Sequence, residues 1–120
     1  MSEARQYEGG CHCGAVRYQV ELALESVTEC NCSSCSKRGT LLTFVPDSQF
    51  QLRKGSLATL PDYQFGKKHI HYPFCSTCGV MSFAHGKSPS GAVMVAINAR
   101  CLDGVDATKL TRNFFDGAAL

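Results

Sequence analysis

Charged residues are scarce in this sequence, and neither positive charge nor hydrophobicity forms a long run. Aspartate, glutamate, lysine and arginine make up 18% of the 120 residues, and the formal net charge is only +2. No run of five or more lysines and arginines occurs, so the electrostatic footprint of a nucleic-acid-binding protein is missing. The longest apolar run, 92–97, is far too short to span a bilayer. We therefore expect neither nucleic acid nor a membrane as a partner.

The first eight residues also lack the apolar core of a secretory signal peptide. We therefore expect a cytoplasmic protein, in a reducing compartment where clustered cysteines bind metal more often than they form disulfides. Two alternatives are a framework of four disulfides among the eight cysteines, and catalytic redox cysteines. The absence of a signal peptide and the Cys-x-Cys spacing both argue against the disulfide framework.

The chain length favours one domain over residues 1–120, with little room for a second. Hydrophobic residues make up 44% of the chain, which supports a modest core. Small domains with limited cores often depend on a metal or on disulfides. We therefore expect a metal held by the clustered cysteines to contribute to the folding free energy.

Two-residue periodicity dominates and predicts a mainly β domain. Apolar and polar residues alternate over 16–22 and 50–53, and shorter β-type runs occupy 41–45, 57–60, 63–65, 69–74 and 80–84. The continuous apolar run 92–97 predicts a strand that is buried on both faces. The tail, 106–120, shows only a weak helical stretch, and no long amphipathic helix or internal repeat occurs.

Seven of the eight cysteines fall into three tight groups, which are Cys11 and Cys13, then Cys30, Cys32 and Cys35, and finally Cys75 and Cys78. Thiolates two or three residues apart can bind one ion, and tetrahedral zinc accepts four of them. Seven thiolates indicate one closed site and one site with three protein ligands and an open position. Spacing alone does not decide which groups share an ion.

The middle group, Cys30-x-Cys32-x-x-Cys35, can hold one ion by itself. Its fourth ligand could be water, a substrate thiol, Cys101 or a histidine. The four histidines are His12, His69, His71 and His85. Each could be that ligand or a proton shuttle, although histidines are more often surface or hydrogen-bonded residues. Cys101 is more typical of a small buried residue than of a ligand.

The arrangement resembles the glutathione-dependent formaldehyde-activating enzyme family, which also contains the centromere protein V domain. The segments that carry the resemblance are 10–18 (GCHCGAVRY), 30–37 (CNCSSCSK), 74–79 (FCSTCG), 98–106 (NARCLDGVD) and 115–117 (FDG). The resemblance implies one β-rich domain like that of the Mss4 group, with two zinc ions. It implies a structural zinc at Cys11, Cys13, Cys75 and Cys78. A second zinc would be held by Cys30, Cys32 and Cys35 and completed by glutathione or solvent.

A zinc ion with three thiolates suits thiol chemistry, because its net charge makes it a weak Lewis acid for generating hydroxide. With the resemblance, this predicts a carbon–sulfur lyase that acts on glutathione–aldehyde adducts, similar to S-(hydroxymethyl)glutathione synthase. Lys37 and Arg38 are candidates to bind a glutathione carboxylate, and their alternative interpretation is a solvated loop pair. The alternative functions are a non-catalytic zinc module that binds a protein, and a thiol- or redox-responsive zinc protein.

Overall fold

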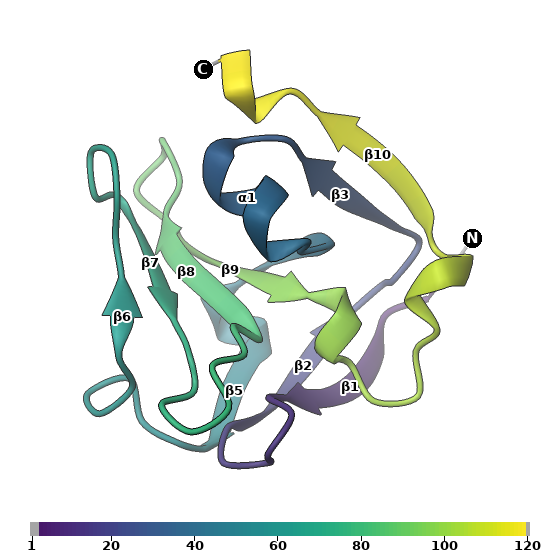
Figure 1. Cartoon of the computed structure of the whole chain (residues 1–120). Helices are drawn as coiled ribbons and strands as arrows, with labels where there is room; N and C mark the ends of the chain where they lie inside the picture. Colours follow the sequence, from purple (N-terminus) through teal and green to yellow (C-terminus); the bar gives the residue numbers. More distant parts are fainter. Residues whose placement is uncertain (1–2, 120) are drawn as a thin grey trace.

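The chain forms two β-sheets that share one core (Figure 1). The computed structural model describes residues 3–119. The small sheet contains, in order, β1 (Arg5–Gly10), β2 (Arg17–Leu22) and β5 (Phe50–Lys54). The large sheet contains, from edge to edge, β10 (Thr111–Phe115), β3 (Ser26–Cys30), β4 (Leu42–Pro46), β9 (Val93–Asn98), β8 (Phe83–Lys87), β7 (Ile70–Pro73) and β6 (Asp62–Tyr63). The predicted mainly β fold is confirmed.

Helical structure is confined to short segments. One α-helix, α1 (Ser33–Arg38), follows β3, and four single 3₁₀ turns are η1 (Asp47–Gln49), η2 (Ala99–Cys101), η3 (Ala107–Lys109) and η4 (Gly117–Ala119). None of the helices within residues 3–119 is long and apolar enough to cross a membrane.

The core lies between the two sheets. Alternate residues of β2 point into it, and Tyr18 and Val20 are each only 1% exposed. Three rings join the sheets: Tyr18 lies 5.2 Å from Phe50 and 5.9 Å from Phe83, measured between ring centroids. The buried Tyr18 hydroxyl donates a hydrogen bond to the Ser82 carbonyl at 3.1 Å. The alternating pattern in 16–22 therefore predicted both the strand and its buried face.

The strand β9 differs from its prediction. Val95 and Ile97 are buried in the core, but Val93 is 40% exposed and Met94 and Ala96 are only partly buried. The expectation of burial on both faces was wrong, because the face that carries Met94 and Ala96 borders cavities instead of a covering layer.

Segment 57–60, which was predicted to be a strand, is a turn. The Ser56 carbonyl accepts hydrogen bonds from the backbone N–H groups of Thr59 and Leu60, and its hydroxyl accepts one from Ala58. A serine that bonds to the backbone ahead of it competes with strand pairing. The local hydrophobic pattern of 57–60 contained no sign of this competition.

Two other predicted strands have different limits. In the 80–84 run the strand begins only at Phe83. The carbonyls of Val80, Met81 and Ser82 accept hydrogen bonds from groups that do not take part in the strand pairing of β8. In the 63–65 run only Tyr63 belongs to β6, and the Phe65 ring instead stacks between Tyr63 and Tyr72.

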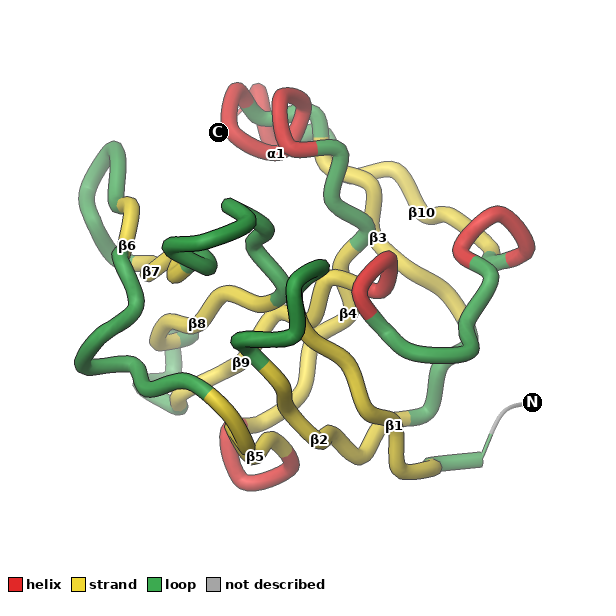
Figure 2. The backbone as a smooth tube through the Cα atoms, turned by 60° about the horizontal axis from the view of Figure 1, so that its bottom comes forward, coloured by secondary structure: helices red, strands yellow, loops and turns green. Residues whose placement is uncertain are grey.

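The tail is not helical where helix was predicted. Residues Thr111–Phe115 form β10, which pairs in parallel with β3 at the edge of the large sheet. Only short 3₁₀ turns flank it, and Leu120 lies outside the described residues. In Figures 1 and 2 the C-terminal end of this segment lies beside α1. This pairing brings the end of the chain next to Cys30.

Candidate metal centres

Four cysteine sulfurs from two distant turns converge in one site, which we call the four-cysteine site. Cys11 and Cys13 lie in the turn between β1 and β2, whereas Cys75 and Cys78 lie in the turn between β7 and β8. All four sulfurs lie within 4.8 Å of one another. The Sγ atoms of Cys13 and Cys75 are 3.6 Å apart, and those of Cys11 and Cys13 are 3.7 Å apart. Tetrahedral zinc with bonds of about 2.3 Å requires sulfurs about 3.8 Å apart.

The two turns have the same construction. The Cys11 N–H bonds to the Val16 carbonyl and the Cys75 N–H to the Val80 carbonyl, each at 3.1 Å. A glycine with a left-handed backbone follows the second cysteine of each pair: Gly14 has φ 86° and Gly79 has φ 79°. Because an L side chain is strained in this conformation, glycine is the residue that closes such a turn. The dipeptides Cys13-Gly14 and Cys78-Gly79 are therefore a local sequence feature that both turns share.

Backbone N–H groups point at the sulfurs of the four-cysteine site. Val16 N donates to Cys11 Sγ at 3.3 Å, and Thr77 N donates to Cys75 Sγ at 3.4 Å. N–H groups of Cys13 and Val80 lower the pKa of Cys78 to about 6. A zinc ion with four thiolates carries a net charge of −2, and N–H donors that favour thiolates offset part of this charge. The residues therefore fit a zinc ion.

A second group of three sulfurs lies at the start of α1, and we call it the three-cysteine site. Cys30 ends β3, Cys32 is the N-cap of α1, and Cys35 lies within the helix. The three sulfurs lie within 4.8 Å of one another. Cys32 N donates to Cys30 Sγ at 3.4 Å, and Cys35 N donates to Cys32 Sγ at 3.3 Å.

The thiols of the three-cysteine site do not all ionise readily without a cation. Burial and the neighbouring Cys32 raise the pKa of Cys35 to about 12. Burial also raises the pKa of Cys32, but N–H donors, chiefly that of Cys35, lower it on balance. A metal ion among the three sulfurs would stabilise all three as thiolates. This donor set also fits zinc.

The helix α1 was missed in the sequence, although its end carries a signal. Gly39 caps the helix with a left-handed φ of 66°, and the basic residues Lys37 and Arg38 occupy the last turn. Both features are typical of a helix C-terminus. Six residues are too few to show a helical hydrophobic period, and none of them is buried.

No residue in the described part of the chain joins the three-cysteine site as a fourth ligand. Within residues 3–119, no histidine, further cysteine or carboxylate belongs to the group of sulfurs. Cys101 lies near the other site, where burial and the charges of Cys11 and Cys78 raise its pKa to about 11. Cys101 is therefore not the missing ligand.

The histidines lie elsewhere as well. His71 pairs with Asp62, with 2.6 Å between Nδ1 and Oδ2, and its ring stacks on His85 at 4.9 Å between centroids. His12 and His69 are exposed. None of the four lines the cavity that adjoins the three-cysteine site. The count of seven cysteines predicted an open fourth position at the three-cysteine site. In the described structure no histidine lies beside that position.

The C-terminal segment packs against the three-cysteine site. The Asn31 amide donates to Asp116 Oδ1 at 2.9 Å, and Asn31 Oδ1 accepts from the backbone N–H of Ala118 at 2.9 Å. A methyl group at Gly117 would lie 2.5 Å from Cys30 Sγ. Composition and periodicity did not predict this contact, because it joins residues more than eighty positions apart.

The three-cysteine site opens into a cavity of about 310 Å³, which we call the main cavity. All three cysteines line it, together with Arg38 and Tyr72. Lys37 does not line it, but Lys37 and Arg38 together line another cavity of about 260 Å³. Burial, and then the charges of Cys35 and Cys32, raise the pKa of Tyr72, so that its phenol remains a proton donor at neutral pH.

This chain is similar to a solved structure and to a known protein family. A crystal structure of a Rhodobacter sphaeroides protein is 31% identical to this chain and superposes with a TM-score of 0.74. The match covers 88% of this chain and 99% of the other. The sequence model of the glutathione-dependent formaldehyde-activating enzyme family matches residues 6–117. This chain therefore belongs to the glutathione-dependent formaldehyde-activating enzyme family.

Proposed function

We propose that this protein is a zinc-dependent carbon–sulfur lyase that forms and cleaves adducts between a small thiol, such as glutathione, and an aldehyde. Membership of a family named for glutathione-dependent formaldehyde activation supports this proposal. The observation that carries it is the three-cysteine site, which has no fourth ligand among residues 3–119 and opens into the main cavity. A non-catalytic zinc module would need four protein ligands at both sites, so the geometry favours an enzyme.

The two sites divide structural and chemical roles between two zinc ions. Cys11, Cys13, Cys75 and Cys78 would hold a closed structural zinc, and Cys30, Cys32 and Cys35 an open one. Zinc at the open site would bind an incoming thiol as its thiolate, and a soft thiolate is the ligand that such a site prefers.

The chemistry needs no oxidant. In the forward direction a carbon–sulfur bond forms as the carbonyl π bond breaks, and the thiol proton ends on the carbonyl oxygen. Tyr72, which lines the main cavity and has a raised pKa, would donate a hydrogen bond to that oxygen. Arg38 supplies the positive charge for a substrate carboxylate, and Lys37 contributes from the outer face of α1.

We also propose the wider setting of this activity. Residues 1–120 would make up a single domain of the Mss4-like type, and residues 1–2 and 120 lie outside the described structure. The protein would act in the cytoplasm, where thiols stay reduced, and all eight cysteines are free here.

The test is the exchange of formaldehyde with glutathione, followed by NMR on protein that holds two zinc ions. We expect exchange at least tenfold faster than the spontaneous reaction, and a return to the spontaneous rate in Cys35→Ser. Ser36→Ala is the matched control, because this exposed neighbour on α1 lies outside the cluster. An unchanged exchange rate with both zinc ions bound would refute the lyase proposal. Zinc release under mild oxidant in such an inactive protein would favour the redox-responsive alternative instead.

A further inference from the structure

The walls of the main cavity are mostly apolar. Beyond the three cysteines, side chains from β4, β7 and the C-terminal segment dominate its surface, including Leu42, Phe44, Ile70 and Phe115. Its volume of about 310 Å³ falls in the range of small-molecule sites. Phe44 is 53% exposed and Ile70 is 44% exposed, which is a large apolar area to leave in water.

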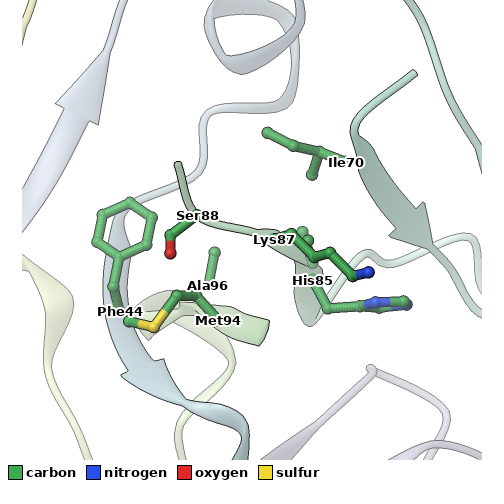
Figure 3. A pocket seen from close by; sticks show the side chains of 9 residues that line it. Phe44, Ile70, His85, Lys87, Ser88, Met94 and Ala96 are labelled. Carbon is green, nitrogen blue, oxygen red and sulfur yellow. The ribbon is translucent and has the colours of Figure 1, made fainter. Parts of the chain in front are cut away.

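A neighbouring cavity of about 230 Å³ extends this apolar space away from the cysteines. Both cavities are bordered by Phe44, Ile70 and Ala96, so they adjoin, and we call the two together the channel. Figure 3 shows Phe44 on one side of the neighbouring cavity and Ile70 on the other, with Met94 and Ala96 between them. Methionine adapts to irregular apolar ligands. The channel can therefore take a chain that extends from the sulfur site.

Arg38 is the only cationic side chain that lines the main cavity within the described chain, and no carboxylate lines it. Its guanidinium lies 4.6 Å from the Tyr72 ring centroid and 5.5 Å from that of Tyr63. It stands three residues after Cys35, hence on the same side of α1. Stacking holds this charge in place, so that one carboxylate can be bound near the thiol.

The formaldehyde adduct does not fill this site. It adds a single carbon to the thiol, so the apolar channel would stay filled with water. Resting on the lyase function proposed above, we propose that the preferred aldehyde carries an apolar substituent, an alkyl chain or a phenyl ring, which lies in the channel. The thiol half carries a carboxylate that Arg38 binds. The adduct forms as before, with the thiol proton on the carbonyl oxygen and no redox change.

Binding of unreactive analogues tests the channel independently of catalysis. The probes are S-methyl-, S-butyl- and S-hexylglutathione, titrated by calorimetry into protein that holds two zinc ions. Burying one methylene is worth up to about a fourfold gain in affinity. We therefore expect the dissociation constant to fall at least tenfold from S-methyl- to S-hexylglutathione.

Variants assign this gain to the channel. Phe44→Ser should reduce the gain from methyl to hexyl below threefold, and the half-exposed position should tolerate the change. Val93→Ser on β9 is the matched control, because Val93 is similarly exposed but lines neither cavity. Arg38→Gln should weaken all three ligands by a similar factor, about tenfold, whereas Lys54→Gln, which changes an exposed lysine that lines neither cavity, should change them less than twofold. Circular dichroism verifies that each variant is folded.

Rates with formaldehyde and hexanal separate this inference from the function on which it rests. Acceleration of both reactions, with a lower KM for hexanal, supports both proposals. Acceleration with formaldehyde and equal affinity for the three analogues overturns the apolar-substrate inference but leaves the lyase function in place. No acceleration with either aldehyde overturns the lyase function, and the adduct substrate with it, whatever the analogues show.

Discussion

Replacing Cys75 with serine is expected to unfold the protein. Cys75 is 2% exposed, and its sulfur lies in the four-cysteine site, which joins turns that are 62 residues apart in sequence. Structural zinc binding contributes roughly 10–16 kcal/mol in small zinc peptides, which equals or exceeds the stability of a typical domain. Loss of one ligand from this site should therefore remove most of the folding free energy. Urea denaturation followed by circular dichroism, with zinc analysis, measures the effect.

Cys35→Ser is the matched control, because it makes the same chemical change in the three-cysteine site. That site uses residues within one short segment, so its ion closes no long loop. We expect this variant to lose one zinc ion and to keep a cooperative unfolding transition within about 2 kcal/mol of wild type. A Cys75→Ser protein with the wild-type unfolding midpoint would show that the four-cysteine site is not structural.

Gly117→Ala should empty the three-cysteine site while leaving the fold intact. The added methyl group would lie 2.5 Å from Cys30 Sγ and 3.2 Å from Cys32 Cβ. Contacts this short force either the sulfur or the C-terminal segment to move. The ion held by three sulfurs should then be lost at least tenfold more readily in a chelator titration. Zinc analysis should give one ion per chain after mild chelation, against two for wild type.

Gly91→Ala controls for the substitution itself. Gly91 lies in the turn before β9 with φ 88°, and nothing lies within 4 Å of the added methyl group. It should lose about 1 kcal/mol of stability through backbone strain and should keep both zinc ions. Equal zinc retention in Gly117→Ala and Gly91→Ala would mean that the C-terminal segment does not press on the site.

Local sequence predicted the parts of this protein that depend on local chemistry. The alternation in 16–22 predicted β2, and the tight spacing within each cysteine group predicted sulfurs that can share an ion. The count of seven cysteines predicted a division into four and three. The resemblance predicted which cysteines belong to each group, and the structure brings the same groups together. These signals work because each depends on residues a few positions apart.

The parts that were missed depend on contacts between distant residues. Every residue of β10 is exposed, so no buried face marked it as a strand, and its parallel partner β3 lies some 85 residues earlier. The channel also has no sequence signature, because a cavity is the absence of a covering layer over Met94 and Ala96. Lys37 and Arg38 were equivalent in the sequence, and only the structure shows that Arg38 lines the main cavity whereas Lys37 does not.

The most direct test of the account is whether an external thiol reaches the zinc of the three-cysteine site. X-ray absorption at the zinc edge can detect this when the selenol analogue of glutathione is added to protein with two bound zinc ions. The account predicts a zinc–selenium distance in the spectrum of wild type and none in that of Cys35→Ser. Two fully bound zinc ions with no selenium neighbour in wild type would contradict an open, thiol-accepting site.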